Sequence, residues 1–187
     1  MKACAASLAL AALLAACGSV APARFHTLLA AGAPSFEQQR TITWELLPIA
    51  IPAQVDRPQW VVRGGDGTLA VLENERWIAP LGAEMHGAIG ERLAETIGAS
   101  RTSAKPWRVR IDVQRFDSLP GRAARIEADW SVSGASASFD CRASYEDAAA
   151  AGFPALAAAH RGAVRRLADA IAAALVALDA GRAATCR

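Results

Sequence analysis

Residues 107–116 read WRVRIDVQRF, and their side chains alternate between apolar and polar from Trp107 to Gln114. The apolar face carries Trp107, Val109, Ile111 and Val113, and the polar face carries Arg108, Arg110, Asp112 and Gln114. A period of two is typical of a β-strand with one buried face. This segment is therefore the strand around which the rest of the fold can be placed.

Two more strand candidates follow it, at residues 125–132 and 136–144, with Ser133-Gly134-Ala135 between them as a turn. Three consecutive strands joined by short turns predict an antiparallel meander. Upstream, residues 41–51 begin with alternating apolar side chains and predict a strand that is interrupted near Pro48. The interruption is expected because proline has no N–H to donate to a β-ladder.

Shorter strands are indicated nearer the N-terminus. Residues 25–28 predict a short edge strand. Residues 59–63 and 68–73 predict a hairpin, because the Gly-Gly-Asp-Gly sequence at 64–67 supplies the positive φ angles that tight hairpin turns need.

Two helices are indicated by apolar side chains at helical spacing. Met85, Ile89, Leu93 and Ile97 form one stripe of a helix over 83–98 that ends at Gly98, with Glu84, Glu91, Arg92 and Glu95 on its solvent side. A longer helix is predicted from about Pro154 to Leu178. The predicted fold class is α+β: a two-layer sandwich, mostly antiparallel sheet, with two amphipathic helices packed on one face.

The chain is 187 residues long, which suits one domain. Its 20 basic and 18 acidic side chains nearly cancel, so nothing in the charge favours nucleic-acid binding. We expect no nucleic-acid partner.

The N-terminus reads as a secretion signal. Lys2 precedes a short apolar run, residues 5–14, which is too short to span a membrane. The run ends in Leu14-Ala15-Ala16-Cys17, which resembles the bacterial lipobox, where the cysteine is acylated; the alternative is an ordinary signal that contains a cysteine. We expect a signal peptide at 1–16, a lipidated tether at 17–40, a single domain at 41–180 and a C-terminal tail at 181–187. Gly18 follows Cys17, and by resemblance to the sorting rule of Gram-negative lipoproteins this favours the outer membrane, with the body in the periplasm.

Two cysteines remain once Cys4 is removed with the signal and Cys17 is lipidated. Cys141 and Cys186 would lie in an oxidising compartment, where they could form a disulfide. The alternative is two unpaired thiols. Neither cysteine has the spacing of a metal site.

No catalytic or cofactor motif emerges. Residues 65–70 formally match a dinucleotide fingerprint, but the following residues predict a strand, and the fingerprint must open a helix. The histidines are far apart in sequence, and His86 and His160 read as structural. We expect no enzyme activity, no cofactor and no metal.

Four residues around the hairpin stand out as candidates for partner binding: Trp60, Arg63, Arg76 and Trp77. Tryptophan and arginine are typical of binding hot spots when they are exposed. The competing interpretation is that both tryptophans belong to the core of a small domain.

A resemblance to a known family rests on four segments: RFHTL at 24–28, IPAQVDRPQ at 51–59, ERWIAPL at 75–81 and WRVRIDVQRFD at 107–117. This series is similar to the PqiC-type (YmbA-like) lipoproteins, the auxiliary lipoprotein component of MCE-type ABC transport systems. His26 stands where that family usually has tyrosine, and the pair Cys141 and Cys186 departs from its pattern.

The resemblance implies a non-enzymatic docking subunit, anchored in outer-membrane lipid through acylated Cys17. Its partner would be a periplasm-spanning MCE-domain subunit that carries lipids or other hydrophobic molecules, and a homo-oligomer is plausible. Two alternatives stay open: an accessory lipoprotein for outer-membrane assembly or for a cell-wall synthase, and a lipid-anchored periplasmic enzyme.

Overall fold

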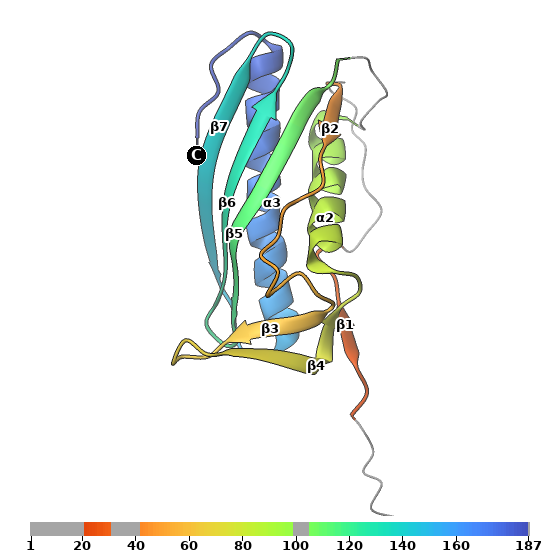
Figure 1. Ribbon diagram of the computed structural model, residues 1–187, viewed down its shortest axis with the longest axis vertical. Helices are drawn as coiled ribbons and strands as arrows, with labels where there is room; N and C mark the ends of the chain where they lie inside the picture. Colours follow the sequence, from red (N-terminus) through yellow and green to blue (C-terminus); the bar gives the residue numbers. More distant parts are fainter. Residues whose placement is uncertain (1–20, 31–41, 99–104, 187) are drawn as a thin grey trace, which may run out of the picture.

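The computed structural model describes residues 21–30, 42–98 and 105–186. The predicted signal peptide, Cys17 and most of the predicted tether lie outside these residues. Within them, two helices and two mixed sheets form an α+β fold, which confirms the predicted class (Figure 1).

The larger sheet is built around the WRVRIDVQRF strand. It has the order β2-β5-β6-β7, with bounds Trp44–Leu46, Trp107–Leu119, Ala123–Ser133 and Ser138–Ala148. Strands β5, β6 and β7 pair antiparallel, which confirms the meander. Val109, Ile111 and Val113 are almost completely buried, as their alternation predicts.

Strand β2 corrects the prediction for residues 41–51. Among residues 42–51, only Trp44–Leu46 are strand, and they pair with β5 in parallel. Beyond them the chain still follows β5 through three backbone hydrogen bonds: Leu47 N to Val109 O at 2.9 Å, Ala50 N to Ile111 O at 3.1 Å, and Val113 N to Ala50 O at 2.9 Å. Pro48 lies between the donors Leu47 and Ala50, where the register moves by one residue, from Leu46 opposite Val109 to Ala50 opposite Asp112. The interruption therefore lies near Pro48, as predicted.

The remaining strands form a separate small sheet rather than part of one continuous layer. Its order is β1-β4-β3, with bounds Arg24–His26, Leu69–Trp77 and Gln59–Arg63. Strands β3 and β4 are the predicted hairpin, with Gly67 at φ 86° in its turn, and β4 runs four residues further than expected. Strand β1 lies inside the predicted tether but pairs in parallel with β4, so it is part of the folded body.

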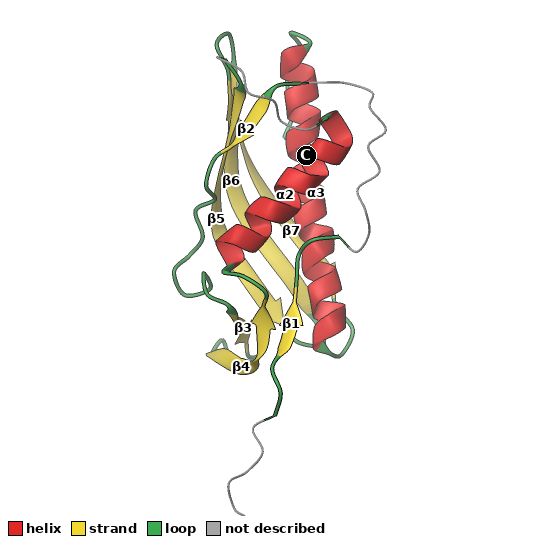
Figure 2. Cartoon of the chain, turned by 90° about the vertical axis from the view of Figure 1, so that its right-hand side faces the viewer, coloured by secondary structure: helices red, strands yellow, loops and turns green. Residues whose placement is uncertain are grey.

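Both helices lie on the same side of the larger sheet and pack against each other (Figure 2). Helix α2 spans Leu81–Ile97 and ends at Gly98, whose φ of 89° suits glycine. Its predicted stripe is buried at every position. Helix α3 spans Phe153–Asp179 and covers β5, β6 and β7. Glu84, however, is only 4% exposed, so its predicted place on the solvent side of α2 was wrong.

Candidate functional site

The two tryptophans proposed as partner contacts lie in the core. Trp60 is 0% exposed and Trp77 is 2% exposed, with their ring centroids 4.3 Å apart. They belong to an aromatic cluster that joins the small sheet to β5 and α3; its other members are His26, Phe116, Phe153 and His160. In this fold neither tryptophan presents a surface to a partner, so the structure places both in the competing role of core residues.

A buried hydrogen-bond chain runs through this cluster. Trp60 Nε1 donates to Ser118 Oγ at 2.7 Å, and Ser118 Oγ lies 2.8 Å from His160 Nε2. Burial lowers the pKa of the His160 imidazole to about 3, so the ring is neutral at pH 7 and carries one proton, on Nδ1 or on Nε2. Its Nδ1 has no hydrogen-bond partner among the described residues.

Ser118 and His160 have the spacing of a nucleophile and its base, but their surroundings do not suit catalysis. Both side chains are buried, and the serine hydroxyl is already occupied by the Trp60 indole. A nucleophile must reach a substrate carbonyl or phosphorus atom. We therefore assign a structural role to the hydrogen bonds between Trp60, Ser118 and His160: they fix the position of the small sheet against α3.

The two arginines of the predicted site remain at the surface. Arg63 Nε donates to Asp117 Oδ1 at 2.9 Å, and Arg76 Nη2 lies 3.4 Å from Glu73 Oε2. Each arginine side chain is about one-third exposed. Arg63 and Arg76 thus remain available to a partner, and their role as contacts stays a prediction.

Sequence analysis missed a pair of buried carboxylates that hold the leading segment, which we define as residues 24–28. The first is Glu75 on β4, which is 4% exposed. It forms an ion pair with Arg24, and its Oε2 lies 2.7 Å from His26 Nε2. The sequence could have indicated the burial of Glu75, because Glu75 is two residues before Trp77 and side chains two residues apart share one face of a strand.

The second carboxylate is Glu84 on α2. Its Oε2 accepts hydrogen bonds from Thr27 Oγ1 and from Leu28 N, both at 2.8 Å. From α3, Arg161 Nη1 donates to Thr27 O at 3.1 Å. The leading segment is therefore fastened to β4, α2 and α3 together. The helical spacing of Glu84 with the buried Leu81 and Ala88 could have indicated its burial.

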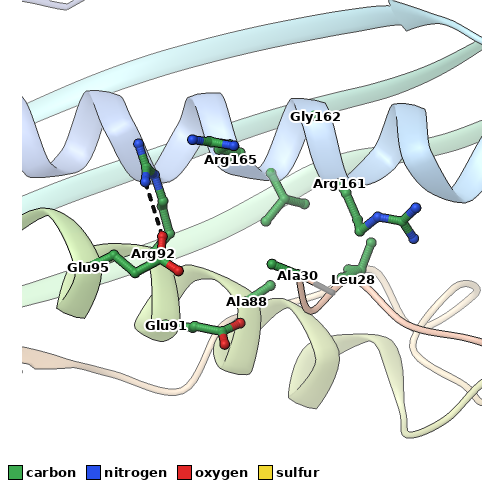
Figure 3. A pocket seen from close by; sticks show the side chains of 10 residues that line it. Leu28, Ala30, Ala88, Glu91, Arg92, Glu95, Arg161, Gly162 and Arg165 are labelled. Atoms are coloured by element: carbon green, nitrogen blue, oxygen red, sulfur yellow. Dashed lines mark hydrogen bonds and ion pairs between the residues drawn. The ribbon is translucent and has the colours of Figure 1, made fainter. Parts of the chain in front are cut away.

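A cavity of about 290 Å³ lies between α2 and α3, beside the leading segment (Figure 3). Apolar and charged side chains both line it: Leu28, Ala30, Ala88, Glu91, Arg92, Glu95, Arg161, Val164 and Arg165, with Gly162. Arg92 joins the two helices, since its Nε donates to Asp169 Oδ1 at 2.7 Å and its Nη1 to Glu95 Oε2 at 3.0 Å. The volume of the cavity is near the lower limit for ligand sites, and its charged lining does not suit an acyl chain.

Cys141 and Cys186 form a disulfide, with their Cα atoms 5.5 Å apart. The bond ties β7 to the C-terminal tail, which returns along β7 after α3 (Figure 1). A covered strand edge is protected against pairing with other chains.

Within the described part of the chain, no group of His, Cys, Asp or Glu side chains gathers as metal ligands would. None of the helices in residues 21–30, 42–98 and 105–186 combines the length and apolar character needed to cross a membrane.

Comparisons with known proteins agree with this fold. Residues 26–172 match the family described as "ABC-type transport auxiliary lipoprotein component". A crystal structure of an uncharacterized protein superposes with a TM-score of 0.69 at 12% identity, over 81% of this chain and 97% of that one. Protein XCC0632 from Xanthomonas campestris superposes with a TM-score of 0.63 at 20% identity, over 84% and 97%. No curated protein matches the chain.

Proposed function

This chain belongs to the ABC-type transport auxiliary lipoprotein family, and from that membership we propose that it is the outer-membrane docking subunit of an MCE-type transport system. In this proposal Cys17 is acylated and anchors the protein in the outer membrane, with its body in the periplasm. The body binds a periplasm-spanning MCE-domain subunit that carries lipids or other hydrophobic molecules. The protein itself performs no chemistry.

The observation that carries the proposal is the fastening of the leading segment. Glu75, Glu84 and Arg161 hold residues 24–28 to three elements of the body. A membrane anchor placed at Cys17 would therefore act on the rigid body, not on a loose arm. Such a connection suits a subunit that must hold a partner at a fixed height above a membrane.

The cavity between α2 and α3 favours docking over lipid carriage. Its volume of about 290 Å³ and its charged rim suit a polar segment of a partner better than the two acyl chains of a phospholipid. The exposed part of Arg63, on β3, offers a further polar contact.

The proposal is tested by crosslinking in cells. The mature lipoprotein carries a C-terminal tag, the cells are treated with a crosslinker, and the partners are extracted in mild detergent and identified by mass spectrometry. We expect recovery of an MCE-domain protein, and loss of that recovery when Cys17→Ala mislocalises the bait. Recovery of only outer-membrane assembly or peptidoglycan-synthesis proteins would contradict the proposal.

Charge reversal then locates the surface. Arg63→Glu is expected to reduce the recovered partner. Arg108→Glu is the matched control, because Arg108 is an exposed, ion-paired arginine on the larger sheet. An equal effect of both substitutions would mean that the contact depends on overall charge and not on Arg63.

A further inference from the structure

The exposed large hydrophobic side chains of the described residues belong to two strands of the small sheet or to the residues that follow these strands. They are Phe25, Leu29, Leu69, Val71 and Ile78, which belong to β1 and β4 or to the residues just after them. Phe25 is 57% exposed and Ile78 is 62% exposed. In Figure 1 these strands form the lower end of the molecule, opposite the turn between β6 and β7.

Phe25 and Ile78 are neighbours on one face of the small sheet. Phe25 pairs with Arg76 in the parallel register of β1 and β4, and Ile78 follows Arg76 by two residues. The backbone pairing continues past the strand, because Ile78 N donates to His26 O at 2.9 Å. Arg24 and His26 both contact Glu75, and alternation along β1 places Phe25, which lies between them, on the opposite face.

The resulting patch combines an aromatic ring, an aliphatic side chain and an arginine between them. In water, exposure of Phe25 and Ile78 is unfavourable, and nothing in the described residues covers them. This combination suits the boundary between phospholipid headgroups and acyl chains, where apolar side chains enter the boundary and arginine extends to the phosphates.

The distance to the acylated cysteine limits where a membrane can be. Cys17 precedes Arg24 by seven residues. A fully extended chain covers at most about 3.6 Å per residue, so Cys17 lies within about 25 Å of Arg24. Strand β5 has 13 residues, a length of about 43 Å, and it runs from the small sheet to the far end of the molecule. A bilayer that holds Cys17 therefore lies within about 25 Å of Arg24, which keeps the patch within its reach.

We propose that the small-sheet end is a membrane-contacting surface, in which Phe25 and Ile78 enter the headgroup boundary of a phospholipid bilayer and Arg76 contacts its phosphates. This inference rests on the proposed acylation of Cys17. It adds to that proposal an orientation: the molecule stands on the membrane with the long axis of its sheet pointing into the periplasm. The far end and the groove between α2 and α3 are then free to meet a partner.

The test uses the mature acylated protein, purified from membranes and reconstituted in vesicles of phosphatidylethanolamine with a minority of phosphatidylglycerol. A small share of the lipid carries a photoactivatable diazirine on its acyl chain. After illumination, lipid adducts are located by peptide mass spectrometry. Adducts are expected at Phe25 and Ile78, and the double variant Phe25→Ser and Ile78→Ser should reduce labelling of these peptides about tenfold.

The control variant is Ala135→Phe, which places an exposed aromatic ring in the turn between β6 and β7. We expect no adduct at position 135. As many adducts there as at Phe25 would overturn the inference, as would the absence of adducts at Phe25 and Ile78 on protein whose Cys17 is acylated. The thermal unfolding midpoint of the double variant is compared with that of the wild type. Equal midpoints would show that a loss of labelling does not come from a loss of fold.

The same experiment separates this inference from the proposed function. The mass of the N-terminal peptide reports acylation of Cys17, and an unmodified cysteine contradicts the anchor and the orientation together. Acylated Cys17 without adducts at the patch contradicts the orientation alone and leaves the docking proposal standing.

Discussion

The Nε2 atom of His160 lies 2.8 Å from the hydroxyl oxygen of Ser118, and neither side chain reaches solvent. This contact joins the N-terminal third of the long helix α3 to the end of β5, at the point where the small sheet packs on the larger one. The Trp60 indole donates to the same hydroxyl, so three elements share one polar contact inside an aromatic cluster.

The neutral state of His160 predicts that stability depends on pH. Burial lowers the folded-state pKa to about 3, whereas the unfolded imidazole has its usual pKa of about 6.5. Between these values the unfolded state binds a proton that the folded state does not. The free energy of unfolding should therefore fall as the pH is lowered from about 6 to about 3, by about 1.4 kcal/mol per pH unit from this group.

Urea unfolding at a series of pH values measures this dependence, with His160→Phe as the comparison because a phenyl ring can stack on Phe116 and cannot titrate. The difference between the two proteins isolates the histidine from the carboxylates that titrate in the same range. Parallel curves for the two proteins would contradict the assigned neutral state.

The fastening of the leading segment predicts a selective effect of Glu84→Ala. The substitution leaves the buried N–H of Leu28 without its acceptor, which costs about 1–3 kcal/mol of unfolding free energy. It should also release the segment locally, so that trypsin cleaves after Arg24 faster than in the wild type. Glu91→Ala on the same helix is the control, since Glu91 makes no hydrogen bond within the described residues, and it should change stability by less than about 0.5 kcal/mol. Equal cleavage rates in the two variants would show that Glu84 does not hold the segment.

The disulfide predicts a redox-dependent stability. Cys141 and Cys186 are 45 residues apart, and closing a loop of that length in the unfolded chain is worth about 4 kcal/mol in the chain-entropy description. The domain carrying Cys17→Ala should lose about 2–4 kcal/mol on reduction, measured by urea unfolding with and without dithiothreitol. The further substitutions Cys141→Ala and Cys186→Ala should remove this sensitivity. Reaction of both thiols with a maleimide before reduction would argue against the bond.

The turn between β6 and β7 predicts a steric effect at Gly134. A Cβ atom added there would lie 2.5 Å from the indole ring of Trp107, whose Nε1 donates to Asp179 Oδ1 at 3.2 Å. Gly134→Ala should displace the indole and lower the free energy of unfolding by about 1–3 kcal/mol. Gly65→Ala in the other hairpin is the matched control, because its Cβ would meet no atom within 4 Å. Thermal unfolding compares the two, and an equal loss in both would point to backbone freedom in place of the contact with Trp107.

Much of the fold followed from local patterns. The alternation from Trp107 to Val113 predicted β5, and the i+4 spacing from Met85 to Ile97 predicted the buried face of α2. Both patterns are periodic because one side of each element faces the core, so a single stretch of sequence contains the signal. The RFHTL, DRPQ and ERWIAPL segments carried the family resemblance in the same local way.

The sequence by itself determined the α+β class, the meander, both helices and the family. Only the tertiary structure decided that Trp60 and Trp77 are core residues, that Glu75 and Glu84 are buried hydrogen-bond acceptors, and that the strands divide into two sheets. The reason is physical: a carboxylate can be buried when its partners are placed around it, and those of Glu84 come from residues 56 and 57 positions away. Local periodicity reports which side of an element is apolar, but partners brought together from distant segments decide which polar side chains the core can hold.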